Sequence, residues 1–82
     1  MTYREIFGQV KAEVELLAGQ VVDDPALNLY QSGILDSLNV LHIISFIEDR
    51  YRIDINPMEL SIADLSSLQQ ISGFIQKKLC VA

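Results

Sequence analysis

The sequence of 82 residues contains one cysteine, one histidine, two prolines and no tryptophan. The single cysteine, Cys80, excludes an internal disulfide bond and a zinc site built from cysteines. The single histidine, His42, excludes a histidine cluster that could bind a metal. The absence of disulfide bonds is typical of a reducing compartment, so we expect a cytoplasmic protein.

Basic residues are also scarce. Six Lys and Arg residues stand against eleven Asp and Glu residues, which gives a formal net charge of −5. Binding to a nucleic acid backbone needs clustered basic side chains, so we expect no nucleic acid partner. The negative charge favours partners with basic patches, or it only keeps the protein soluble. No run of about 20 apolar residues is present, and no signal peptide pattern opens the chain, so we expect no membrane span.

The signals that accompany enzyme activity are missing too. A chain of this length predicts a single domain over residues 1–82, with little room for a deep substrate pocket. No glycine-rich phosphate loop occurs. Ser37 and His42 are five residues apart, which places them about 140° apart on a helix, so His42 cannot act as a base for Ser37. We therefore predict that the protein is not an enzyme.

A first helix is predicted over residues 3–18. Thr2 and Glu5 form a capping box before it, and Gly19 fits a left-handed stop after it. Its apolar stripe comprises Tyr3, Phe7, Val10, Val14 and Leu17. Residues 20–36 then show turn signals and no sustained period, which predicts a long loop held across the bundle by its apolar side chains. A short extra helix over residues 26–30 is the alternative.

A second helix is predicted from Ser37 to Arg50 or Tyr51. It is apolar nearly all round, which favours a position inside a bundle. Its predicted core residues are Val40, Ile44, Ile47 and Tyr51, widened by Leu38, Leu41 and Ile43. Asn39, His42 and Asp49 are predicted to be exposed, and the hydroxyl of Ser37 should face water.

Two further helices complete the prediction. Asn56-Pro57-Met58-Glu59 indicates the start of a short helix over residues 57–61. Ser67 opens a last helix, whose core stripe comprises Leu68, Ile71, Ile75 and Leu79, broadened by Phe74. The sum is an all-α fold of three main helices and one short helix around a single core.

The triplet Asp36-Ser37-Leu38 resembles the attachment motif of the acyl carrier protein family, which includes aminoacyl and peptidyl carriers. The likeness extends from Leu29 to Ile75 and includes the helix end at residues 48–51 and the segment 64–68. It implies a four-helix bundle of the acyl-carrier type, with 4′-phosphopantetheine attached covalently to Ser37. In such a protein the thiol of the cofactor carries an acyl or aminoacyl group as a thioester.

The resemblance also implies partners and further sites. The partners would be a phosphopantetheinyl transferase, an acyl- or aminoacyl-loading ligase, and downstream synthase or transferase enzymes. Partner recognition would fall on Asp36, Leu38, Asn39, His42, Glu48 and Asp49. Cargo that bends back into the bundle would meet Ile43, Ile47, Ile55, Leu60, Leu65, Ile71 and Phe74, although an ordinary apolar core would look the same.

Two departures refine this prediction. Fatty-acid carriers hold acidic residues where this chain has Asn39 and His42, which favours a specialised biosynthetic pathway. The start at Met1 without a flanking linker favours a free-standing protein over an excised module, and we expect a monomer. Two alternatives remain open. Asp36 and Ser37 are residues that also cap helices without being modified. The protein could instead be a cofactor-free helical adaptor for protein–protein interaction, with Phe46 as its anchor.

Overall fold

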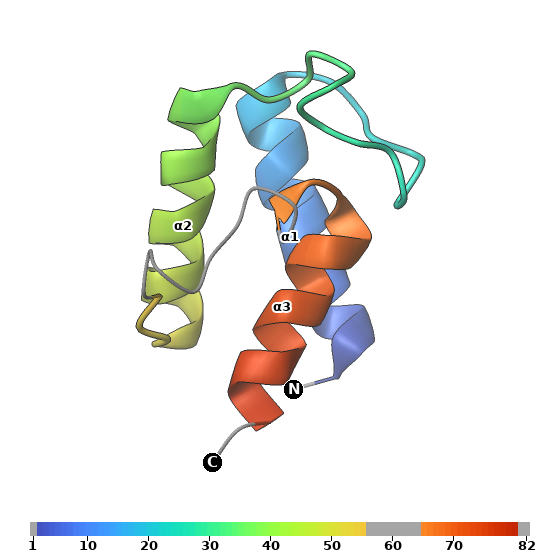
Figure 1. The fold of residues 1–82 in the computed structure, drawn as a ribbon. Coiled ribbons are helices and arrows are strands. Elements are labelled where there is room, and N and C mark those ends of the chain that lie inside the picture. Colours follow the sequence, from blue (N-terminus) through green and yellow to red (C-terminus); the bar gives the residue numbers. More distant parts are fainter. Residues whose placement is uncertain (1, 56–64, 81–82) are drawn as a thin grey trace.

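Three helices form the described part of the computed structural model, which covers residues 2–55 and 65–80 (Figure 1). Helix α1 spans Tyr3–Ala18, α2 spans Ser37–Tyr51 and α3 spans Leu68–Cys80. No strand occurs within these ranges, which confirms the all-α prediction. The short helix predicted over residues 57–61 lies outside the described residues.

Helix α1 begins and ends at the predicted signals. The Thr2 hydroxyl oxygen accepts a hydrogen bond from the Glu5 backbone nitrogen at 3.2 Å, which satisfies one of the free donors of the first turn. Gly19 has a left-handed conformation with φ of 70°, and its N–H donates to the Glu15 carbonyl oxygen at 2.9 Å. These contacts confirm the predicted boundaries at residues 3 and 18.

Helix α2 is capped by a carboxylate. Asp36 has an extended backbone, and its side chain accepts a hydrogen bond from the Asn39 nitrogen at 2.9 Å. The helix therefore begins at Ser37, as predicted. It ends before Arg52, which adopts a left-handed conformation with φ of 55°. Residues other than glycine rarely adopt this backbone conformation.

Helix α3 is opened by a serine cap. The Ser67 hydroxyl oxygen accepts a hydrogen bond from the Gln70 nitrogen at 3.2 Å, which confirms the predicted start. Lys77 and Lys78 lie in the last turn, where they complement the negative end of the helix dipole. The Lys78 ammonium lies 5.9 Å from the centre of the Phe74 ring.

The segment 20–36 contains turns and no helix, so the alternative of a short helix over residues 26–30 is wrong. Local bonds shape it instead. The Asn28 side chain accepts hydrogen bonds from the backbone nitrogens of Tyr30 and Gln31. Val22, Leu29 and Leu35 are buried, which confirms the prediction of a long loop held by apolar side chains.

One apolar cluster joins the three helices and the loop. From α1 it takes Ile6, Val10 and Val14, an i, i+4 row that faces α3 and α2. The predicted stripe was wrong at Tyr3, which is exposed at the edge of this row and lies beside Phe7, with ring centres 6.2 Å apart. Tyr51 of α2 donates a hydrogen bond to the Gln9 side chain of α1 at 2.6 Å.

Helix α2 buries one side against the other described helices, so the prediction that Leu38 and Leu41 widen its core was wrong. Ile43, Ile47 and Tyr51 are buried, whereas Leu38 and Leu41 are each 61% exposed. The reason is that α1 and α3, the other two described helices, lie on the same side of α2 (Figure 1). Leu79, near the end of α3, is also exposed instead of buried. Within the described ranges, no helix is long and apolar enough to traverse a bilayer.

Candidate functional site

Ser37 is the first residue of α2, and its side chain is exposed. The preceding residue, Asp36, uses its carboxylate to cap Asn39, and its carbonyl oxygen accepts from the Val40 nitrogen at 3.2 Å. Among the described residues, no protein acceptor takes a hydrogen bond from the backbone N–H groups of Ser37 and Leu38. These free donors and the positive end of the helix dipole suit an anion attached to the Ser37 hydroxyl.

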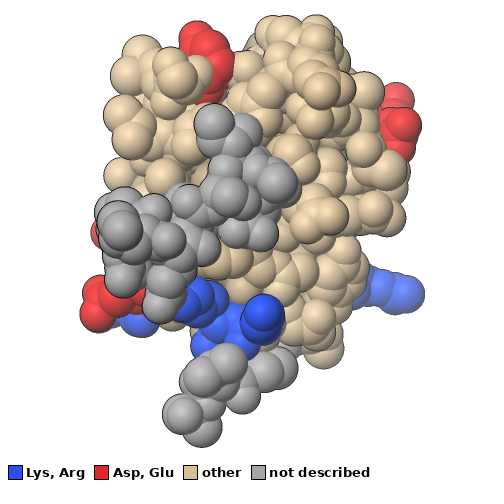
Figure 2. Space-filling view, viewed as in Figure 1, with Lys and Arg blue, Asp and Glu red and all other residues tan. Residues whose placement is uncertain are grey.

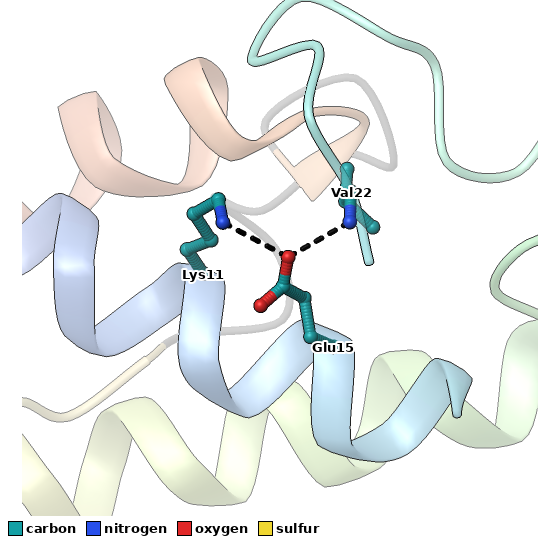
Figure 3. Close-up of polar contacts among 3 residues, drawn as sticks. All are labelled: Lys11, Glu15 and Val22. Carbon is teal, nitrogen blue, oxygen red and sulfur yellow. Dashed lines mark hydrogen bonds and ion pairs between the residues drawn. The ribbon is translucent and has the colours of Figure 1, made fainter. Parts of the chain in front are cut away.

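A carboxylate at the end of α1 holds the start of the loop that leads to Ser37 (Figure 3). One oxygen of Glu15 accepts a hydrogen bond from the Val22 nitrogen at 2.8 Å and contacts the Lys11 ammonium at 2.9 Å. The Val22 N–H, and next the Lys11 ammonium, lower the pKa of Glu15 below its usual value. The carboxylate therefore stays ionised and keeps the loop attached to α1 at neutral pH.

The residues predicted for partner recognition do not all present free side chains. Asp36, Leu38, His42 and Asp49 are exposed, whereas Asn39 is half-buried. Glu48 is also half-buried, and its carboxylate accepts a hydrogen bond from the Ile55 nitrogen at 3.3 Å. Glu48 thus holds the chain that leaves α2, a role that the sequence did not indicate.

Leu38 and Leu41 form an exposed apolar surface beside Ser37. Leu41 lies four residues after Ser37, which places the two side chains about 40° apart around α2. The i, i+4 spacing from Ser37 could have identified Leu41 as part of the surface beside the serine. Its apolar character instead favoured a core position. The proposed adaptor anchor, Phe46, is half-buried and packs edge-on against Tyr51, with ring centres 6.0 Å apart.

The residues predicted to meet cargo lie in the common core. Ile43, Ile47, Ile55, Leu65 and Ile71 are buried, and Phe74 is half-buried against them. Leu60 lies outside the described residues. Their burial agrees with a lining role and equally with an ordinary core, so the cargo site stays a prediction.

Charges are unevenly placed along the molecule. On the face shown in Figure 2, Lys and Arg side chains appear only in the half opposite the start of α2, whereas Asp and Glu side chains appear near that start, at the right edge and at the lower left beside the basic side chains. Arg50 and Lys77 lie in the last turns of α2 and α3, which end there. In the described ranges, no group of three or more His, Cys, Asp or Glu side chains is arranged to hold a metal ion.

The comparison with protein families supplies the remaining observation. A search of curated proteins finds no match to this chain. The family described as "Phosphopantetheine attachment site" matches residues 8–75, which is more than half of the chain. Domains of this family carry covalent 4′-phosphopantetheine and are not catalytic, in agreement with the predicted cofactor and with the prediction that the chain is no enzyme. The protein therefore belongs to the phosphopantetheine attachment family, which includes the acyl and peptidyl carrier proteins.

Proposed function

We propose that Ser37 bears the 4′-phosphopantetheine group and that the protein carries an acyl or aminoacyl group to partner enzymes. The observation that supports this most strongly is the exposed Ser37 hydroxyl on the first residue of α2. The family match over residues 8–75 includes this position. When bound, the group supplies a thiol that holds the cargo as a thioester, which keeps the cargo at a high effective concentration near the partners.

The chain itself supplies access and geometry for the modification. An unactivated serine is a weak nucleophile, so the transferase must provide the base. A bond forms between Ser37 Oγ and the phosphorus of the phosphopantetheinyl group, the bond from that phosphorus to the nucleotide part of coenzyme A breaks, and the hydroxyl proton passes to the base. The free N–H groups of Ser37 and Leu38 would then face the new phosphodiester.

The surface around Ser37 indicates what the transferase and the other partners present. Leu38 and Leu41 would fit an apolar pocket on the partner. Asp36 and Asp49 would pair with basic side chains around that pocket. Fatty-acid carriers hold acidic residues at the positions of Asn39 and His42, so this surface is less acidic than theirs. This composition supports partners of a specialised biosynthetic pathway.

The second candidate is a cofactor-free adaptor that only binds other proteins. The exposure of Leu38 and Leu41 favours it, because neighbouring exposed apolar side chains often mark an interaction surface. The two functions differ in one respect: the adaptor needs no modification of Ser37. They can therefore be separated by following the mass of the protein.

The test incubates the purified protein with a phosphopantetheinyl transferase and coenzyme A, and records its intact mass. The carrier function predicts that the protein gains one phosphopantetheinyl group and that Ser37→Ala gains none. Ser45→Ala is the matched control, because Ser45 is also an exposed serine on α2, and it should be modified like the original protein. An unmodified original protein that still binds a partner tightly would support the adaptor.

A further inference from the structure

The loop that leads to Ser37 is attached to the start of α3 by two backbone hydrogen bonds. The Leu29 nitrogen donates to the Ser66 carbonyl oxygen at 2.7 Å, and the Gln69 nitrogen donates to the Pro25 carbonyl oxygen at 3.1 Å. The second bond satisfies one of the free donors in the first turn of α3. Segments that are distant in the sequence are thus joined at two points.

Leu29 also fixes the far end of the same loop. Its carbonyl oxygen accepts hydrogen bonds from the Leu35 nitrogen at 2.9 Å and from the Ser32 hydroxyl at 3.3 Å. Leu35 is buried and directly precedes Asp36, the residue that caps α2. An uninterrupted series of contacts therefore runs from Ser66 through Leu29 and Leu35 to the cap of α2.

The position of Leu29 is closely determined. Its side chain is 0% exposed, and both of its backbone polar groups have partners. A smaller side chain would leave a cavity at the point where the loop and α3 meet. The loop could then shift, and the shift would reach Leu35 and the Asp36 cap. The first turn of α2, with Ser37 in it, would lose its fixed position.

We propose that Leu29 is a positioning residue for the modification of Ser37. It touches neither the transferase nor the cofactor, and it acts by holding the loop against α3 so that the Ser37 hydroxyl stands at a fixed place on the recognition surface. The inference rests on the proposed function and adds to it a residue that is fully buried in the free protein. Misplacement of a reacting group by about 1 Å can lower a rate by about a hundredfold.

A purely structural role would also follow from burial, so the test needs a matched control. Ile75 is likewise 0% exposed but lies in the second half of α3. Leu29→Ala and Ile75→Ala should lose comparable stability. We expect Leu29→Ala to lower kcat/KM of the transferase by about ten- to a hundredfold, and Ile75→Ala by less than about twofold, at a temperature where circular dichroism shows both variants folded. Leu29→Ile should recover most of the rate.

A second readout does not depend on the transferase. Hydrogen exchange at the Asn39 amide, which donates to Asp36, should speed up in Leu29→Ala and not in Ile75→Ala. If either alanine variant fails to fold, Leu29→Val and Ile75→Val replace the pair. Equal rates and equal exchange in the two variants would overturn the role of Leu29 while leaving the carrier function intact. If the original protein is never modified, the carrier function fails and amide exchange still decides whether Leu29 holds the cap.

Discussion

The carboxylate of Glu15 accepts a hydrogen bond from the backbone nitrogen of Val22, seven residues further along the chain. Glu48 bears the same relationship to Ile55. Each glutamate lies in the last turn of its helix, and each N–H belongs to a buried residue. In both cases the residue that follows the helix is left-handed. The same device thus directs the chain as it leaves α1 and as it leaves α2.

The Glu15 contact predicts a pH-dependent stability. The folded-state pKa of Glu15 is lowered, first by the Val22 N–H and then by the Lys11 ammonium. Its contribution should therefore be fully present above the unfolded-state pKa of about 4.3 and disappear as the pH falls through the lower folded-state pKa. We expect Glu15→Gln to be less stable than the original protein at pH 7 and to differ less from it near pH 3. Urea unfolding at the two pH values measures this.

Glu13→Gln is the control for this prediction, because it removes the same charge from the same helix at a residue with no hydrogen bond to the loop. It should leave the stability nearly unchanged at both pH values. A constant difference between Glu15→Gln and the original protein from pH 7 to pH 3 would mean that ionisation of Glu15 does not hold the loop.

Arg52 predicts a substitution that stabilises the protein. The backbone of Arg52 is left-handed, and the Cβ atom of any residue but glycine makes this conformation unfavourable. Relief of a strain of about 1–2 kcal/mol outweighs the extra chain entropy that glycine loses on folding, about 0.5–1 kcal/mol, so Arg52→Gly should raise the free energy of unfolding by about 0.5–1 kcal/mol. Arg50→Gly, inside α2, should lower it by about 1 kcal/mol, because glycine is a poor helix former. A loss of stability in both variants would show that the left-handed conformation at Arg52 is not strained.

Ser72 predicts a second stabilising substitution. Its side chain is 0% exposed, and its hydroxyl has no hydrogen-bond partner among the described residues. Ser72→Ala removes an unsatisfied polar group and improves helix propensity, so it should raise the free energy of unfolding by about 1–2 kcal/mol. Ser45 is exposed, so Ser45→Ala should raise the free energy of unfolding only through its better helix propensity, by about 0.5 kcal/mol. Urea denaturation compares the two, and a destabilised Ser72→Ala would reveal a bound partner for the hydroxyl.

Leu41 should contribute to binding of the transferase. Because its side chain is 61% exposed beside Ser37, Leu41→Ala should change stability little and raise the transferase KM by about tenfold. Leu16→Ala is the matched control, since Leu16 is still more exposed but lies on α1. Equal KM values for the two variants would exclude Leu41 from the docking surface.

Salt provides an independent test of the carboxylates. If Asp36 and Asp49 meet basic side chains on the transferase, the KM should rise with ionic strength, because surface charges are screened. An unchanged KM from low to high salt would mean that the contact is mainly apolar.

Local signals in the sequence predicted the ends of the helices, because a cap depends only on its nearest neighbours. Thr2, Gly19, Asp36 and Ser67 act as their residue types indicate. The same local logic placed Ser37 at the exposed start of α2. The long loop was recognised from its turns and from apolar residues such as Leu29.

Tertiary features could not be predicted in this way. Leu38 and Leu41 are as apolar as core residues, and their exposure depends on how many helices cover α2. The contacts of Glu48 with Ile55 and of Leu29 with Ser66 require the path of the chain in space. For the same reason, sequence periodicity favoured Tyr3 over Ile6 as a core residue of α1.

The most direct test of the account locates the modification after treatment with transferase and coenzyme A. Cleavage after Lys and Arg releases the peptide 12–50, which contains Ser32, Ser37 and Ser45. Tandem mass spectrometry of this peptide should place the phosphopantetheinyl group on Ser37 alone. A modified peptide that carries the group on Ser32 or Ser45, or a fully treated protein whose Ser37 stays bare, would contradict the account.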